Sequence, residues 1–175
     1  MTHRVTLIGF RASGKSTIGR LLAARLAWPF TDADTAIEAR LGQPIATYFK
    51  EHGEAAFRLA EEQALAALLV GEGPLVLATG GGAVLRPANR ELLRERGGLI
   101  VYLDVPVPVI QDRLRHHTGG RPSLTGASVV DEVPGLLAQR EPLYRELASL
   151  VIPALAGPAE VAARLSDELS TRGIV

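Results

Sequence analysis

Short apolar runs alternate along the chain with longer segments in which apolar residues recur every three or four positions. The short runs predict strands at residues 5–8, 30–32, 75–78, 99–103 and 150–152, and those at 5–8 and 75–78 are expected to be buried. The longer segments predict helices at residues 15–27, 35–41, 44–52, 54–70, 87–96, 108–115, about 129–149 and 158–171. Residues 116–128 lack periodicity and contain glycine and proline, which indicates a surface loop. This alternation predicts an α/β fold with a parallel sheet covered by helices on both faces.

The segment that follows the first strand has the pattern of a phosphate-binding loop. Residues 9–16 read Gly-Phe-Arg-Ala-Ser-Gly-Lys-Ser and fit G-x-x-x-x-G-K-[ST]. Successive backbone N–H groups in such a loop surround an anion, and the following helix N-terminus adds partial positive charge. Lys15 would reach the β- and γ-phosphates, and the Ser16 hydroxyl would ligate Mg²⁺. We therefore expect nucleoside triphosphate to contact Gly9, Arg11, Ala12, Ser13, Gly14, Lys15, Ser16 and Thr17.

Composition limits the remaining possibilities. The 175 residues suffice for one domain, which we expect to span residues 1–175. Cysteine is absent, so disulfides, thiolate metal sites and cysteine nucleophiles are excluded. The formal net charge of +0 argues against a nucleic-acid partner. No run approaches the ~20 apolar residues of a membrane helix, and no signal peptide is visible, so we expect a cytoplasmic protein without a membrane partner.

Two carboxylates follow the second predicted strand. Asp32 and Asp34 are two residues apart, so at an extended strand end they would point the same way. One could hold the water shell of a metal ion, and the other could orient or deprotonate an attacking hydroxyl. The alternative is that an aspartate only caps the helix predicted from residue 35.

Further polar features have two interpretations each. Arg58 could fork a substrate carboxylate while Glu61 holds it in place, or the two could form a solvated helix pair. Residues 80–82, three glycines after the third strand, leave backbone N–H groups open to a ligand or simply make a tight turn. Arg121, in the predicted loop, could close over the phosphates or lie exposed, and Arg140 is equally ambiguous.

In their order along the chain, these motifs resemble those of the shikimate kinase family. They are the phosphate loop, Asp32-x-Asp34, Phe57-Arg58-x-x-Glu61, Thr79-Gly80-Gly81-Gly82, Arg121-Pro122 and Arg140-x-Pro142-Leu143-Tyr144. The resemblance implies a three-layer α/β/α P-loop kinase fold with a five-stranded parallel sheet ordered 2-3-1-4-5. It also implies transfer of the γ-phosphate of ATP to the 3-hydroxyl of shikimate, on the route to chorismate and the aromatic amino acids, in a monomer.

The resemblance further implies a role for each matching residue. In catalysis, Lys15 contacts the transferring phosphate, Asp34 binds shikimate hydroxyls and serves as the base, and Arg121 belongs to a lid at residues 116–128. Mg²⁺ is bound by Ser16 and, through water, by Asp32. The substrate-binding region covers about residues 32–62. Arg58 and Arg140 hold the shikimate carboxylate, and Glu61 holds the Arg58 guanidinium in place. The backbone of Gly80, Gly81 and Gly82 forms a wall of the pocket. Arg115 is preferred over Arg113 and His117 for an added nucleotide contact.

The chain departs from the family pattern at two positions. Ala12 replaces the middle glycine of the phosphate loop, which would cost about 1 kcal/mol if that position needs positive φ. Ser123 stands where the lid usually has leucine. Two alternatives stay open: a related small-molecule kinase acting on gluconate or a nucleotide, and a non-catalytic shikimate-kinase-like domain that binds an effector.

Overall fold

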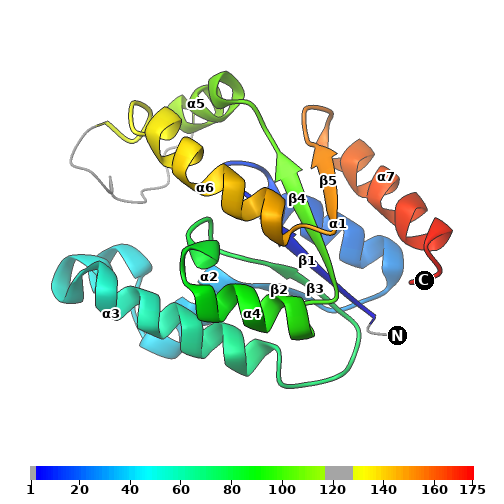
Figure 1. The fold of residues 1–175 in the computed structure, drawn as a ribbon, viewed down its shortest axis with the longest axis horizontal. Coiled ribbons are helices and arrows are strands. Elements are labelled where there is room, and N and C mark those ends of the chain that lie inside the picture. The colour runs from blue at the N-terminus through cyan, green and yellow to red at the C-terminus, as the bar shows by residue number, and fades with distance from the viewer. Residues whose placement is uncertain (1–2, 117–127) are drawn as a thin grey trace.

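Five strands form one parallel sheet in the computed structural model, which describes residues 3–116 and 128–175 (Figure 1). The strands are β1 (Arg4–Ile8), β2 (Phe30–Asp32), β3 (Leu75–Ala78), β4 (Leu99–Asp104) and β5 (Leu150–Pro153). Their order is β2-β3-β1-β4-β5, so the implied order 2-3-1-4-5 is confirmed. The central strand β1 pairs with β3 and β4, and all four strand pairs are parallel.

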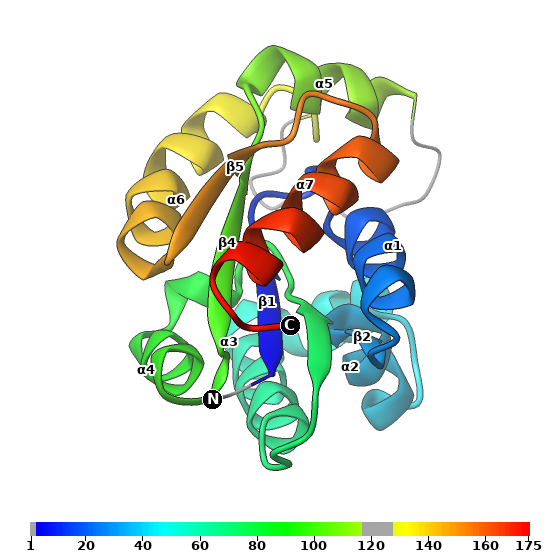
Figure 2. The ribbon, with the colours of Figure 1, turned by 90° about the vertical axis from the view of Figure 1, so that its right-hand side faces the viewer.

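Helices cover both faces of this sheet, which confirms the predicted three layers. They are α1 (Lys15–Leu26), α2 (Ala33–Leu41), α3 (Ile45–Leu68), the 3₁₀ turn η1 (Ala83–Leu85), α4 (Pro87–Arg96), α5 (Val107–Arg115), α6 (Val133–Leu147) and α7 (Pro158–Thr171). Helices α1 and α7 pack against each other on one side, and α4 and α6 lie on the other (Figure 1, Figure 2). Within the described residues, no helix is long and apolar enough to cross a membrane.

The core follows the apolar runs of β1, β3 and β4, whereas the edge strands β2 and β5 are only partly buried. Every residue of β1 is buried, including Arg4, whose guanidinium donates to the carbonyl oxygens of Leu69, Gly73 and Arg96 at 3.1–3.3 Å. A second, smaller core joins α2 to α3 through Ile37, Phe57 and Ala64. The α2–α3 region therefore packs as a unit beside the sheet and carries several of the candidate site residues.

Glycine 53 divides α3, as the sequence predicts. Its φ of +80° and ψ of 175° are not helical, so residues 45–52 and 54–68 are two helical segments that meet without a loop. The predicted loop falls mainly on residues 117–127, which lie outside the described part of the chain. The predictions for Arg121, His117 and Ser123 therefore concern residues that the structure does not describe.

Candidate active site

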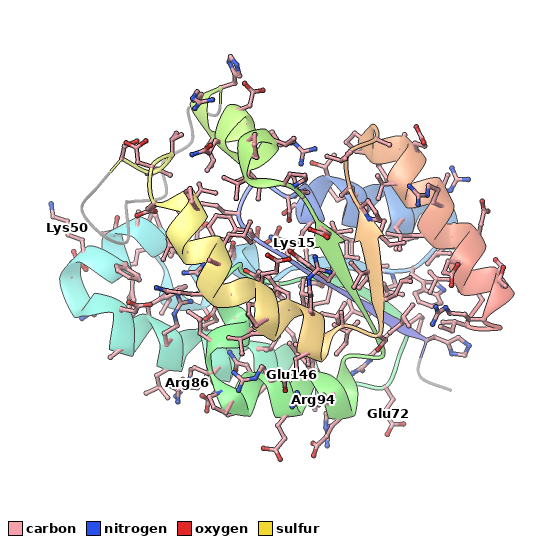
Figure 3. The ribbon with its side chains drawn as sticks, turned by 45° about the horizontal axis from the view of Figure 1, so that its top comes forward. Lys15, Lys50, Glu72, Arg86, Arg94 and Glu146 are labelled. Atoms are coloured by element: carbon pink, nitrogen blue, oxygen red, sulfur yellow. The ribbon has the colours of Figure 1, made fainter. Side chains whose placement is uncertain are left out.

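The phosphate loop connects β1 to α1 at the carboxyl end of the sheet. Gly9 and Gly14 have φ values of +146° and +96°, and a side chain on Gly9 would start 3.0 Å from the Leu103 carbonyl oxygen. Lys15 is buried, and its Nζ donates to the carbonyl oxygens of Gly9 and Phe10 at 2.8 and 2.7 Å. Figure 3 shows Lys15 inside the molecule, whereas Lys50 points outward at its periphery. A cation at a helix N-terminus lined with N–H groups is a binding site for phosphates.

Ala12 occupies a left-handed backbone conformation in this loop. Its φ is +59°, so the position does require the conformation that glycine adopts most easily. The positive φ on which the cost of having alanine here depends is therefore present. The loop is additionally held by Arg113 of α5, whose guanidinium donates to the Ala12 carbonyl oxygen at 3.0 Å and to that of Ala154 at 3.2 Å.

Asp32 caps a helix and also contacts the phosphate loop. One of its carboxylate oxygens accepts from the backbone N–H groups of Asp34 at 3.0 Å and Thr35 at 3.4 Å, so Asp32 caps α2. Its other oxygen accepts from the Ser16 hydroxyl. The prediction that Asp32 and Asp34 both lie on an extended strand end is wrong, because β2 ends at Asp32 and Ala33 already begins α2. Asp34 therefore projects from the first turn of a helix.

Two cavities adjoin at Asp34. The nucleotide-side cavity, of about 860 Å³, is lined by the phosphate loop and by residues of α5 and the β5–α7 connection. The second cavity is lined by Arg11, Asp34, Ile45, Phe49, Phe57, Arg58, Glu61, Gly80, Gly81, Gly82 and Arg140. Asp34 lines both, so its carboxylate stands where a group bound in one cavity would meet a group bound in the other.

Arg58 and Glu61 form a buried ion pair in the second cavity. Arg58 Nη1 and Glu61 Oε2 are 2.8 Å apart, and the two side chains are 10% and 3% exposed. Burial raises the pKa of the Glu61 carboxyl above 4.5, and the neighbouring Arg58 partly opposes this shift. The interpretation as a solvated helix pair is therefore wrong. Glu54 also bonds Arg58, so the guanidinium is held from two sides.

The three glycines are required by close approach. None of Gly80, Gly81 and Gly82 has positive φ. A Cβ on Gly82 would lie 2.3 Å from Arg58 Nη1, and a Cβ on Gly80 would lie 2.9 Å from Asp34 Oδ1. A side chain on Gly80 or Gly82 would displace charged groups of the second cavity, and a Cβ on Gly81 would lie 3.2 Å from the backbone nitrogen of Arg11 in the phosphate loop.

Arg140 completes the charged lining. It is 5% exposed, and its guanidinium lies 5.5 Å from the centre of the Phe10 ring. Among the described residues, Arg140 forms no salt bridge with a carboxylate, in contrast to Arg58. Tyr144, one turn further along α6, donates a 2.5 Å hydrogen bond to the Gly81 carbonyl oxygen, and burial raises the Tyr144 pKa to about 12. A buried guanidinium without a carboxylate partner is suited to an anionic ligand.

The structure brings together most of the residues predicted to contact nucleotide. Arg11 through Thr17 line the nucleotide-side cavity, and Gly9 lies in the same loop. Arg115 lines neither cavity and is exposed at the end of α5. Arg113 lines the nucleotide-side cavity instead, and its spacing of three residues from the buried Ile110 is the sequence signal for this inward position. Arg121 lies outside the described residues.

Comparison with known proteins gives a consistent result. A family model described as shikimate kinase matches residues 11–170. The curated shikimate kinase of Nitratidesulfovibrio vulgaris is 50% identical over 166 residues, which cover 94% of this chain and 92% of the relative. That of Halorhodospira halophila is 48% identical over 161 residues, or 92% of this chain and 89% of the relative. A solved shikimate kinase from Acinetobacter baumannii in complex with shikimate matches with a TM-score of 0.89 and 36% identity, covering 97% of this chain and 93% of the other.

Proposed function

The chain belongs to the shikimate kinase family, and from this premise we propose how its own residues carry out the family's reaction. The reaction transfers the γ-phosphoryl group of ATP to the 3-hydroxyl of shikimate. The observation that carries the assignment is the meeting of the two cavities at Asp34. ATP occupies the cavity along the phosphate loop, and shikimate occupies the cavity that contains Arg58 and Arg140.

Shikimate carries a carboxylate and hydroxyls, and the second cavity offers a partner for each. Arg140 lacks a carboxylate partner among the described residues, so a carboxylate on the substrate supplies one. Arg58, held by Glu61 and Glu54, presents a fixed guanidinium beside it. The glycine wall lets the substrate lie close to the backbone, and Ile45, Phe49 and Phe57 give the cavity an apolar side for the carbon ring.

Asp34 is the group that accepts the proton. The 3-hydroxyl oxygen attacks the γ-phosphorus, the bond to the β–γ bridging oxygen breaks with its electron pair staying on ADP, and the hydroxyl proton passes to Asp34. Lys15 neutralises charge on the phosphates from the loop. A lid role for Arg121 remains a proposal from the family resemblance.

The residues present fit a magnesium ion. Ser16 supplies a hydroxyl and Asp32 a carboxylate on the same side of the phosphate loop, and Mg²⁺ prefers such oxygen donors together with substrate phosphates and waters. When bound there, Mg²⁺ neutralises negative charge on the phosphates. Ser16 would bind it directly, and Asp32, which also caps α2, would bind it through water.

Arg113 is the better candidate for the added nucleotide contact. It lines the nucleotide-side cavity together with Ala154, Ala156 and Pro158, and its guanidinium plane is fixed by two carbonyl oxygens. We propose that this corner receives the adenine. One chain lines both cavities, and the proposal of a monomer rests on the family resemblance.

An acceptor panel tests the function. ADP release is measured by a coupled assay with ATP and Mg²⁺, adding shikimate, gluconate or AMP. We expect release that depends on shikimate alone. The two lysines offer a matched pair: Lys15→Met should abolish turnover, and Lys50→Met, at an exposed position, should leave it unchanged. Release with gluconate or AMP and none with shikimate would contradict the assignment.

A further inference from the structure

Arg11 is placed unusually for a residue of a phosphate loop. Arg11 and Asp34 are the two side chains that line both cavities in the part of the chain that the structure describes. Asp34 already has a role at this junction as the proton acceptor. Arg11 belongs to the phosphate loop, but its guanidinium also reaches the second cavity.

The Arg11 side chain is held in a fixed position. Its Nη2 lies 2.8 Å from Glu132 Oε1, and the two side chains are only 7% and 1% exposed. The guanidinium also lies 5.6 Å from the centre of the Phe10 ring, the same ring that Arg140 approaches at 5.5 Å. Glu132 directly precedes α6, so this ion pair joins the phosphate loop to the helix that carries Arg140. An arginine side chain stays protonated in proteins, so a positive charge persists at the junction.

One nitrogen of the Arg11 guanidinium is not used by the ion pair with Glu132. Arg11 Nη1 is buried and has no hydrogen-bond partner among the described residues. Buried polar groups are rarely left without a partner, so this nitrogen is a donor open to a bound acceptor. The group that moves through the junction between the two cavities during the reaction is the phosphoryl group, whose oxygens are acceptors.

We propose that Arg11 is a catalytic residue that stabilises the negative charge of the phosphoryl group in transfer, and that Glu132 is a positioning residue that holds Arg11 there. This inference rests on the proposed function. The bonds made and broken are those already described: the γ-phosphorus leaves the β–γ bridging oxygen, bonds the 3-oxygen, and the hydroxyl proton goes to Asp34. Arg11 donates hydrogen bonds to the phosphoryl oxygens and exchanges no proton.

The test replaces the charge and keeps the side-chain length. Arginine residues that stabilise this kind of transition state contribute roughly 10³–10⁵ to kcat, so we expect Arg11→Met to lower kcat by at least about 100-fold. The dissociation constant of shikimate without nucleotide, measured by calorimetry, should change less than about threefold, since the interaction is made in the transition state. Arg11→Lys should recover part of kcat. Arg20→Met is the matched control, because Arg20 also lies over a phenylalanine ring, 5.3 Å from that of Phe30, and lines neither cavity.

Glu132→Gln tests the positioning role. It should lower kcat less than Arg11→Met does, and its effect should be smaller in the Arg11→Met background, because Glu132 acts through Arg11. If the ion pair were only structural, the effects of Arg11→Met and Glu132→Gln on thermal stability would be non-additive. Their effects on kcat would show no such coupling. If Arg11→Met does not fold, the kcat of Arg11→Lys carries the test.

Three results would overturn the proposal. One is a kcat for Arg11→Met equal to that of Arg20→Met. Another is a rise in the shikimate dissociation constant with kcat unchanged, which would make Arg11 a ground-state carboxylate ligand. The third is an undiminished effect of Glu132→Gln when Arg11 is already Met. Absence of shikimate-dependent ADP release in the unmodified protein would instead refute the proposed function on which the inference rests.

Discussion

Replacing Ala12 by glycine should stabilise this protein. Ala12 has a φ of +59° in the phosphate loop, and the only other described non-glycine residue with positive φ is Ala27, at +53° after α1. The left-handed conformation costs an alanine about 1–2 kcal/mol. A glycine avoids that cost, but the unfolded chain then has more conformational freedom, which lowers the free energy of unfolding by about 0.5–1 kcal/mol. The net gain lies between about 0 and about 1.5 kcal/mol, and its midpoint of about 0.75 kcal/mol corresponds for 175 residues to a rise of about 2 °C in Tm.

Thermal unfolding followed by calorimetry measures this gain, and Ala27→Gly is its control. Ala27 has the same backbone conformation but lines neither cavity, so its replacement should raise Tm by a similar amount without any effect on kinetics. If Ala27→Gly raises Tm and Ala12→Gly lowers it, the reasoning about the phosphate loop is refuted. If neither variant raises Tm, backbone strain is not the controlling factor at either position.

Three other predictions concern the second cavity, where we propose that shikimate binds. Gly82→Ala should raise the KM for shikimate by about tenfold or more, because the new Cβ would meet Arg58 Nη1 at 2.3 Å. Tenfold corresponds to a loss of about 1.4 kcal/mol of binding free energy. A KM within twofold of normal would contradict the close-approach argument. Tyr144→Phe leaves the Gly81 carbonyl oxygen without its donor, at a cost of about 1–3 kcal/mol, so the KM for shikimate should rise while the KM for ATP stays constant. The pKa of Glu61 is raised above 4.5, so as the pH falls its carboxyl becomes protonated earlier than an exposed glutamate would and loses its hold on Arg58. The KM for shikimate should therefore rise toward acid pH. In Glu61→Gln, the KM should already be raised at neutral pH and should lack the increase that depends on Glu61. Identical pH profiles for the variant and the unmodified protein would refute this role.

The sequence predicts the fold well because its signals are local. Buried strands, the glycine and proline breaks and the phosphate loop each depend on a few neighbouring residues, and the break at Gly53 appears where the pattern places it. The strand order came from the resemblance to a family, since pairing between β1 and β3 or β4 joins residues far apart in the chain. The backbone at Asp34 was mispredicted, because the strong cap formed by Asp32 starts α2 one residue after the strand.

The charged residues of the candidate site could be predicted from the sequence, whereas the contacts that hold them in place could not. The Arg58–Glu61 spacing suggests a pair, but only burial shows that this pair is not solvated. Glu132 and Tyr144 act on residues distant in sequence, Arg11 and Gly81, so no local pattern reports those contacts. The glycine run at residues 80–82 signals close approach, while the groups that approach come from other elements.

Asp34→Asn is the most direct test of the central claim, which is that phosphoryl transfer to shikimate takes place where the two cavities meet at Asp34. The amide keeps the size of the side chain and cannot take the proton. Shikimate-dependent ADP release should be abolished in this variant, while the dissociation constant for ATP, measured by calorimetry, should stay nearly unchanged. Near-normal turnover of shikimate by Asp34→Asn would contradict the account.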